Sequence, residues 1–397
     1  MPFVVYIFAV SAFALGLAEF VPIGLTTVMA AGLNVGIETA GLAVTAYALG
    51  AVIAAPVLTA LTANWTRKGV MLVAAFVFTV GALVVPVTEN VTLILVARFA
   101  AGMGHGLFMA AASSTAARLA GPRKAGSAVA VVFGGFTLAL AVGVPFSVYL
   151  SETVSWQLIL GAIGVFGAIG FFGLLIGMRD PLPATSLTKK SAMSNLAVLF
   201  HGKLLFGALV TVFAYAGSFA AYTYITPLLS EITGVEATSI STFMLVYGVM
   251  AAVGNILGGN ITDKLGANAA SAIVILGIAL TCLVMWIGST SPVVMIVMVA
   301  LLGLFSYAAV PALQARLIKV AESHSPDAQS VASGLNIAGF NSGIALGSVL
   351  GGITITEIGL EHVGLVGAVA ALVGFIMVLM PLSTAQRENG LAKGIQS

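Results

Sequence analysis

The stretch LILVARFAAGMGHGLFMAAASSTAAR, residues 93–118, is a helix-length apolar segment that carries Arg98 and His105 in its interior. A charged side chain at the centre of a membrane-spanning helix costs about 2.5–3.5 kcal/mol on insertion scales, so such residues usually face a cavity and serve a function. Arg98, Gly102 and His105 follow one another at i, i+4 and i+7, which places them on one face of a helix. The only other strongly ionisable residue deep in an apolar run is Glu19. We therefore expect Glu19, Arg98 and His105 to face one polar cavity.

The composition is that of an integral membrane protein. Of the 397 residues, 60% are hydrophobic and only 7% are charged, whereas about 25% of the residues in a soluble domain are charged. The single cysteine, Cys282, excludes an intrachain disulfide. The first apolar run has no basic segment before it and no A-x-A-like cleavage site after it, so we expect a retained helix rather than a signal peptide.

Twelve apolar runs are long enough to cross a membrane, which takes about 20 residues. They cover residues 4–29, 41–61, 70–88, 92–117, 126–150, 157–178, 204–229, 240–261, 269–289, 292–318, 330–356 and 362–382. Of the 15 Lys and Arg residues, 14 fall on one side of the predicted membrane, and Arg98 lies within it. The loops on the other side contain Glu but neither Lys nor Arg. The positive-inside rule therefore places both termini in the cytoplasm.

The longest polar connection, residues 179–203, divides the spans six and six. The two halves match at an offset of about 200, so that G-L-A-E at 16–19 aligns with G-S-F-A at 217–220. We expect an N-terminal six-helix bundle at 1–178, a cytoplasmic central loop at 179–203, and a C-terminal six-helix bundle with a short cytoplasmic tail at 204–397. Two such repeats are typical of transporters whose binding site lies between the repeats near the membrane midplane.

The eighth span is followed by Gly259-Asn-Ile-Thr-Asp263-Lys264-Leu-Gly266. This segment resembles the G-x-x-x-D-[RK]-x-G signature of the major facilitator superfamily, and it lies where that signature belongs, after the second span of a half. In physical terms, Asp263 can sit against the N-terminal dipole of a neighbouring helix and latch one conformation. The alternative is a tight turn with a solvated Asp–Lys pair. In the first half Ala63 replaces the acid, which puts a matching latch there in doubt.

Two further segments resemble motifs of the proton antiporters in this superfamily. Arg98-Phe-Ala-Ala-Gly102 resembles R-x-x-[QG]-G on the fourth helix, whose arginine the family links to proton transfer; the alternative is an arginine that snorkels outward. Gly-Val-Pro at 143–145 stands where the fifth helix of antiporters has Gly-Pro, although glycines at this spacing also mark plain helix contacts. The other residues assigned to the conformational motifs are Arg67, Lys68, Gly135, Gly143 and Pro145.

Glu19 is the expected proton carrier. It lies about 20 Å along the first helix, at a depth comparable to that of Arg98. Burial favours the protonated form of a carboxyl group and a nearby cation favours the charged form, so a Glu19–Arg98 pair can load and release a proton. The alternative is a structural ion pair that locks the first and fourth spans together. His105 either takes part in the relay or is a hydrogen-bonded packing residue.

Aromatic and amide side chains supply candidate contacts for a substrate. Tyr215, Phe219 and Tyr222 follow one another at i, i+4 and i+7, and a pocket lined by them would offer stacking and hydrogen bonds. Stripes of Tyr and Phe also occur as plain helix packing. The substrate-binding candidates are Phe20, Tyr215, Phe219, Tyr222, Tyr307, Asn336 and Asn341.

Four segments together resemble the arabinose- and sugar-efflux-like branch of the 12-span drug:proton antiporters: LAEFVPIGL at 17–25, LTANWTRK at 61–68, YTYITPLL at 222–229 and SGLNIAGFNSGIALGSVLGG at 333–352. The resemblance covers essentially the whole chain. It implies a multi-pass protein of the bacterial inner membrane that exports a small organic solute in exchange for protons. Members of the branch are linked to sugars, nucleosides and amphenicol-type drugs, and the resemblance also implies a link to multidrug resistance.

The expected fold is an all-α membrane protein of twelve helices in two bundles that move by alternating access. The expected partners are a small-molecule substrate, protons and membrane lipid, without nucleic acid, cofactor or metal, and the chain is expected to be a monomer. A proton-coupled importer of a sugar or nucleoside is the alternative function. An intramembrane enzyme is not expected, because the histidines at 105, 201, 324 and 362 are too scattered for a motif such as H-E-x-x-H.

Overall fold

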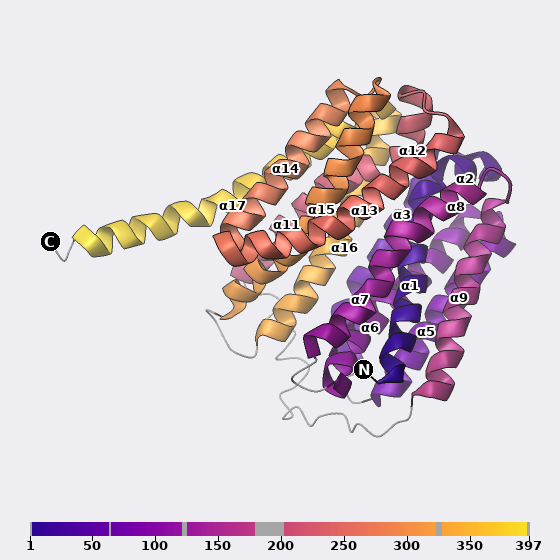
Figure 1. Ribbon diagram of the computed structural model, residues 1–397, viewed down its shortest axis with the longest axis horizontal. Coiled ribbons are helices and arrows are strands. Elements are labelled where there is room, and N and C mark those ends of the chain that lie inside the picture. Colours follow the sequence, from indigo (N-terminus) through magenta and orange to yellow (C-terminus); the bar gives the residue numbers. More distant parts are fainter. Residues whose placement is uncertain (1, 63–64, 121–124, 179–201, 323–327, 395–397) are drawn as a thin grey trace.

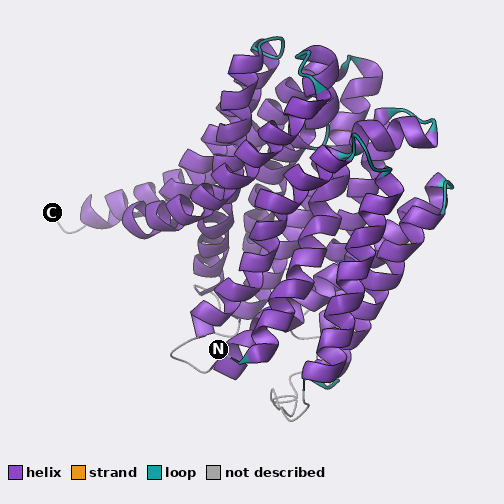
Figure 2. Ribbon diagram, turned by 45° about the vertical axis from the view of Figure 1, so that its right-hand side comes forward, coloured by secondary structure: helices purple, strands orange, loops and turns teal. Residues whose placement is uncertain are grey.

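The computed structural model describes residues 2–62, 65–120, 125–178, 202–322 and 328–394. These residues form helices and short connections, and no β-strand occurs among them (Figure 2). Twelve of the described helical segments are long and apolar enough to cross a membrane, which confirms the predicted number. Most of the predicted central loop, residues 179–201, lies outside the described part of the chain.

The helices of the first half are α1 (Phe3–Gly24), α2 (Thr26–Leu33), α3 (Ile37–Ile53), η1 (Ala54–Leu58), α4 (Thr59–Leu61), α5 (Arg67–Val84), η2 (Val85–Val87), α6 (Val91–Ala120), α7 (Ala125–Leu138), η3 (Ala139–Gly143), α8 (Val144–Leu150) and α9 (Trp156–Gly177). Those of the second half are α11 (Gly202–Tyr222), α12 (Ile225–Pro227), η4 (Leu228–Ile232), α13 (Ala237–Leu265), α14 (Ala267–Ile287), α15 (Pro292–Glu322), α16 (Ala328–Glu357), η5 (Leu360–His362) and α17 (Val363–Gly394).

Prolines explain where the spans depart from continuous α-helix. The first span was expected to run to residue 29, but α1 ends at Gly24, shortly after Pro22. The seventh was expected to reach 229, but α11 ends at Tyr222 and Pro227 follows in α12. Each described π-helix contains a proline or lies within two residues of one. Proline has no N–H to continue the ladder of hydrogen bonds, so the helix breaks or widens locally.

Helix contacts repeat between the halves. In the first half α3 packs on α6, α1 on α7, and α5 on α9; in the second half α13 packs on α15, α11 on α16, and α14 on α17. The helices of each half therefore pair in the same order along the chain. Figure 1 shows the halves as two adjoining groups of helices, with α16 of the second half beside the first half.

The two halves meet through α3 with α16, and through η3 and α8 with α13. Near the end of the bundle opposite the N-terminus, hydroxyl groups donate to backbone carbonyls across this boundary. Thr226 Oγ1 donates to the carbonyls of Ile23 (3.3 Å) and Gly24 (3.2 Å). Ser348 Oγ donates to the carbonyl of Gly41 (3.1 Å). These bonds join the two halves at the end opposite the N-terminus.

Thr26 lies at the same end of the bundle, but its hydroxyl is used within the first half. Its Oγ1 lies 2.9 Å from the carbonyl oxygen of Ile23 and 3.0 Å from that of Pro22, whereas the carbonyl oxygen of Thr223 in the second half is 3.4 Å away. Thr226 and Ser348 therefore donate the shorter hydroxyl bonds across this boundary.

We predict that Thr226→Val opens this end of the bundle more often. A neutral hydrogen bond stabilises by about 1 kcal/mol, so its loss should change the ratio of closed to open molecules roughly fivefold. Spin labels on the exposed residues Asn34 and Glu236, one in each half, would report a larger population of long distances. Thr226→Ser keeps the hydroxyl and should leave the distances unchanged. Unaltered distances in Thr226→Val would show that these bonds do not control closure.

Candidate functional site

Arg98 is fixed to the backbone of two neighbouring helices. Its Nε donates to the carbonyl of Ala43 on α3 (2.9 Å), and its Nη1 donates to the carbonyl of Ala18 on α1. Within α1 the carbonyl of Ala18 would normally accept from residue 22, but Pro22 has no N–H to give. The guanidinium therefore supplies the donor that the sequence of α1 removes. Arg98 is only 4% exposed, which rules out snorkelling to the membrane surface.

Tyr47 lies against the same guanidinium. The central carbon of the Arg98 guanidinium lies 4.4 Å from the centre of the Tyr47 ring, and the Tyr47 hydroxyl donates to the carbonyl of Leu15 (3.2 Å). This contact requires α3 and α6 to run close together, because a Cβ at residue 102 would collide with the backbone carbonyl of Tyr47. Gly102 is thus a close-approach residue that positions Tyr47 over Arg98.

Glu19 and His105 form the second polar pair of the first half. His105 Nδ1 lies 3.5 Å from Glu19 Oε2, and the exposed fractions are 2% for Glu19 and 6% for His105. Neither oxygen of Glu19 has a hydrogen-bond partner among the described residues. The rings of Tyr47 and Phe136 lie on the imidazole at 5.5 and 5.7 Å between centres, and Phe136 also contacts Phe20 at 5.3 Å. The imidazole that neighbours the carboxyl group is thus packed against aromatic rings.

We expected Glu19, Arg98 and His105 to form one group, and the structure pairs only two of them. All three are buried in the first half, but Arg98 has no carboxylate oxygen within 4.0 Å in the described chain. The neighbour of Glu19 is His105, and the partners of Arg98 are two carbonyls and the ring of Tyr47. The reason is Pro22, because a carbonyl without a donor in a membrane interior attracts the nearest strong donor.

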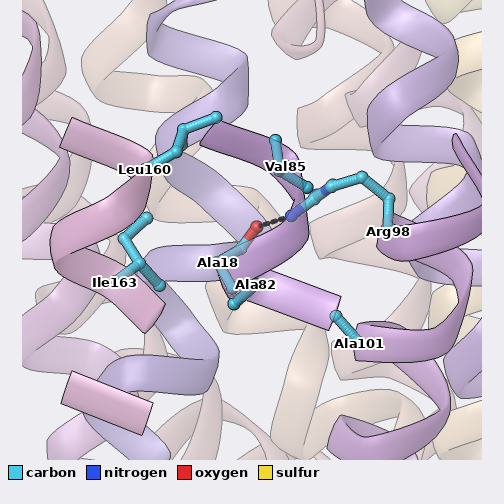
Figure 3. Close-up of a pocket in the computed structure, with 7 residues that line it drawn as sticks. All are labelled: Ala18, Ala82, Val85, Arg98, Ala101, Leu160 and Ile163. Carbon is cyan, nitrogen blue, oxygen red and sulfur yellow. Dashed lines mark hydrogen bonds between the residues drawn. The ribbon is translucent and has the colours of Figure 1, made fainter. Parts of the chain in front are cut away.

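A small cavity adjoins Arg98 (Figure 3). Its volume of about 20 Å³ holds one water molecule but no larger solute. Arg98 Nη2, which has no hydrogen-bond partner within the described ranges, belongs to the guanidinium that lines it. The cavity is lined by Ala18, Ala82, Val85, Arg98, Ala101, Leu160 and Ile163.

The substrate-binding candidates of α11 lie in an aromatic cluster in the second half. Tyr215 contacts Phe340 (4.4 Å between ring centres), and Phe219 contacts Tyr222 (5.6 Å). Tyr222 in turn stacks on Tyr247 of α13, with ring centres 3.9 Å apart and planes 11° from parallel. The three α11 residues thus belong to one aromatic cluster that extends to other helices, and their part in a substrate pocket stays a prediction.

Tyr307 and Tyr222 differ from Tyr215 in their hydroxyl groups. Tyr215 donates to the carbonyl of Ser306 (3.1 Å). The hydroxyls of Tyr222 and Tyr307 are buried without a partner in the described chain. Burying an unpaired hydroxyl costs about 1–3 kcal/mol, so packing alone does not account for these two groups.

The two candidate asparagines have different surroundings. Asn336 is part of a hydrogen-bonded chain: its Oδ1 accepts from Thr211 (2.9 Å) and its Nδ2 donates to Gln314 (2.8 Å). That chain ties α11, α15 and α16 together, which makes a structural role sufficient for Asn336. Asn341 donates to the carbonyl of Ile337 (3.0 Å) in its own helix, while its Oδ1 is buried and unpartnered within the described residues.

The motif residues of the fifth helix lie against α1. A Cβ at Gly135 would collide with the carbonyl of Ala9, and one at Gly143 with the side chain of Leu17. Both glycines therefore allow close packing on the helix that carries Glu19. Pro145 follows the π-helix η3 by two residues and is buried.

The predicted latch residues lie at the end that carries the N-terminus. Asp263 is exposed, and it makes no ion pair within the described ranges. Gly266 has a φ of 83°, a conformation that favours glycine, and it turns the chain from α13 into α14. In the first half Lys68 Nζ donates to the carbonyl of Leu175 near the end of α9 (3.0 Å).

Three contributors were not predicted from the sequence: Pro22, Tyr47 and Tyr247. Pro22 lies four residues after Ala18, so the missing N–H was visible as a helix-interior proline. Tyr47 and Tyr247 are separated by 200 residues, the offset of the repeat, and that match was the signal available for them.

Comparison with known proteins places the chain among transporters. The family model described as Major Facilitator Superfamily matches residues 8–336 and 207–394. The MFS-type transporter YtbD of Bacillus subtilis is 34% identical over 371 residues, 93% of this chain and 92% of the relative. A probable sugar efflux transporter of Helicobacter pylori is 26% identical over 93% of this chain and 92% of its own. The solved structure of the nucleoside transporter NupG is similar in fold, with a TM-score of 0.76 at 15% identity over 94% of this chain and 98% of that one.

We predict that Arg98→Met destabilises the protein and that Pro22→Ala relieves part of the loss. Arg98→Met should cost about 1–3 kcal/mol for each carbonyl left unpaired. In the Pro22→Ala background the carbonyl of Ala18 regains a helical donor, so the same change should cost less by on the order of 1 kcal/mol. Unfolding of the four proteins in detergent measures this coupling. Arg118→Met, which removes an exposed arginine of the same helix, is the control. Purely additive effects would contradict the role assigned to Pro22.

Proposed function

Because the chain belongs to the Major Facilitator Superfamily and is therefore a multi-pass membrane transporter rather than an enzyme, we propose that it exports a small organic solute in exchange for protons. We place it in the bacterial inner membrane and assign it an alternating-access mechanism. The solute is a sugar, a nucleoside or a drug-sized organic molecule. The proton-coupling residues are Glu19, Arg98 and His105.

The surroundings of Glu19 carry the proposal. A buried carboxyl group without hydrogen bonds favours its neutral form, because an isolated charge in an apolar medium is costly. The guanidinium of Arg98 on α6 favours the charged form, and His105 at 3.5 Å does so when its imidazole is protonated. The two tendencies oppose each other, so a modest change of solvation decides whether the group holds a proton. Opening and closing of the two halves supplies such a change.

The position of Arg98 suits this role better than a direct ion pair would. Its hydrogen bonds to Ala18 and Ala43 hold the positive charge at one place whatever the protonation state of Glu19. A tight Glu19–Arg98 pair would stabilise the carboxylate strongly and hinder the binding of a proton. In the proposed cycle Glu19 loads a proton in one conformation and releases it in the other.

The closed end supports an assignment of the conformation. Thr226 and Ser348 close the end opposite the N-terminus, and the distribution of Lys and Arg predicts that the N-terminus is cytoplasmic. The described state is then inward-facing. The latch proposed for Asp263 would engage in the opposite, outward-facing state, which agrees with its exposure here.

The experiment is Glu19→Gln. In exchange, substrate and proton compete, so affinity for substrate should fall as the pH drops and the carboxylate becomes protonated. Glutamine imitates the protonated acid but cannot release a proton. The variant should therefore bind substrate with little dependence on pH, release no proton on binding, and fail to export against a gradient. Binding and proton release are measured on detergent-solubilised protein, and transport is measured in liposomes.

Exchange of substrate for substrate across the liposome membrane is the internal control, since it needs no proton and should survive in Glu19→Gln. Full proton-driven export by the variant would place the carrier elsewhere, with His105 the next candidate. A substrate gradient that collapses when an inward-directed proton gradient is imposed would indicate export, whereas accumulation under that gradient would indicate the alternative importer.

A further inference from the structure

The second half contains a group of buried polar atoms whose hydrogen-bonding capacity the described chain leaves unused. The hydroxyls of Tyr222 and Tyr307 and the Oδ1 of Asn341 have no partner there. The Tyr247 hydroxyl approaches those of Ser218 and Ser306, which bond to each other, without reaching hydrogen-bond geometry itself. These groups come from four helices, α11, α13, α15 and α16.

The tyrosines of this group lie close together, next to the boundary with the first half. Tyr247 stacks on Tyr222 at 3.9 Å, and its ring is perpendicular to that of Tyr307 at 6.4 Å. Tyr307 is near enough to Glu19 for the two groups to interact electrostatically. The residue after Tyr247 is Gly248, where a Cβ would collide with Ala141 of the first half. The cluster therefore borders the boundary at which the two halves move.

The internal repeat shows that Tyr247 occupies the position of Tyr47 in the other half. A Cβ at Gly102 would collide with the carbonyl of Tyr47, and a Cβ at Gly303 would collide with the carbonyl of Tyr247. Tyr247 is thus the counterpart of Tyr47. The residues around Tyr247 correspond, by the internal repeat, to the residues of the proposed proton site around Tyr47. The ring of Tyr47 is covered by the guanidinium of Arg98.

The charged residues of the first half have uncharged counterparts in the second. Four residues before Gly303 lies Val299 in place of Arg98, and three residues after it lies Ser306 in place of His105. The aligned repeat has Ala220 in place of Glu19. Val299, Ser306 and Ala220 therefore offer no charge that could pair with a charged solute seated on Tyr247, and an unpaired charge in such a place is costly. Glu19, which interacts with Tyr307 across the boundary, is the group that binds the proton in the proposed cycle.

We infer that Tyr222, Tyr247 and Tyr307 select an uncharged solute, which stacks a ring face on Tyr247 and takes hydrogen bonds from the hydroxyls of Tyr222 and Tyr307. This inference rests on the proposed function, since it assigns the solute of that same transport cycle. Tyr222 covers the Tyr247 ring in the described state, so the solute takes its place when the rings separate. Tyr247 supplies the ring and the other two supply hydroxyls.

The test is binding to purified wild-type protein in detergent, without any proton gradient. Two scaffolds each provide a neutral, an anionic and a cationic probe: uridine, uridine 5′-monophosphate and 5′-amino-5′-deoxyuridine, and glucose, glucuronate and glucosamine. We expect at least one neutral probe to raise the melting temperature, and its charged analogues to do so only at much higher concentration.

Substitutions distinguish the contribution of each tyrosine's hydroxyl group from that of its ring. Tyr222→Phe and Tyr307→Phe should each weaken binding of the neutral probe about tenfold, while the melting temperature without ligand stays the same or rises, because an unpaired buried hydroxyl has been removed. Tyr247→Leu should abolish binding and Tyr247→Phe should largely retain it. Tyr149→Phe, at an exposed tyrosine of the first half, is the control.

The inference is overturned if only charged probes bind, if no neutral probe binds, or if Tyr222→Phe and Tyr307→Phe bind the neutral probe like the wild type. Its failure is distinguishable from that of the proposed function. Loss of proton coupling appears in Glu19→Gln through pH dependence and transport, and neither enters this binding experiment.

Discussion

The carbonyl oxygen of Ala18 is the point on which the organisation of the first half depends. A membrane interior offers no water to a backbone carbonyl, so every such group must find a donor within the protein. Pro22 removes the donor that a continuous helix would provide, and Arg98 replaces it from α6. This explains how a guanidinium is retained in a segment that is otherwise apolar. It also joins α1, α3 and α6 at one place, since the same side chain binds Ala43.

Because Arg98 binds backbone carbonyls, the buried charged groups of the first half have separate partners. The positive charge is held by carbonyls and by the ring of Tyr47, and the carboxyl group of Glu19 is left with His105 and aromatic neighbours. A charge that is held in place by neutral acceptors influences its surroundings without being neutralised. At matching positions the two halves then differ in kind: the first has Glu19, Arg98 and His105, and the second has Ala220, Val299 and Ser306. Such a division suits a protein in which one half handles protons and the other handles an uncharged solute.

The bonds between the two halves differ in kind from the bond between Arg98 and Ala18. They are donated by the neutral hydroxyls of Thr226 and Ser348 to backbone carbonyls of the first half. Bonds from an arginine are charge-assisted and roughly twice as strong as those between neutral groups, which suits a permanent joint. The neutral threonine and serine bonds across the boundary are individually weak, so their loss and re-formation are compatible with repeated opening.

By itself the sequence determined the class of the protein, its twelve spans and its family. It did so because a bilayer requires about 20 apolar residues for each span and makes every interior charge conspicuous. Glu19, Arg98 and His105 stood out for this reason, and so did the motif around Asp263. Tertiary structure decided how those residues are partnered. Spacing along a helix fixes which residues share a face, but the rotation of that face toward one neighbour or another depends on close packing, such as that of Gly102 on Tyr47. Arg98 and His105 lie seven residues apart on one face of α6, about 10 Å along its axis. Which of them Glu19 meets therefore depends on how α1 and α6 are placed along each other, and the packing of the whole bundle sets that placement.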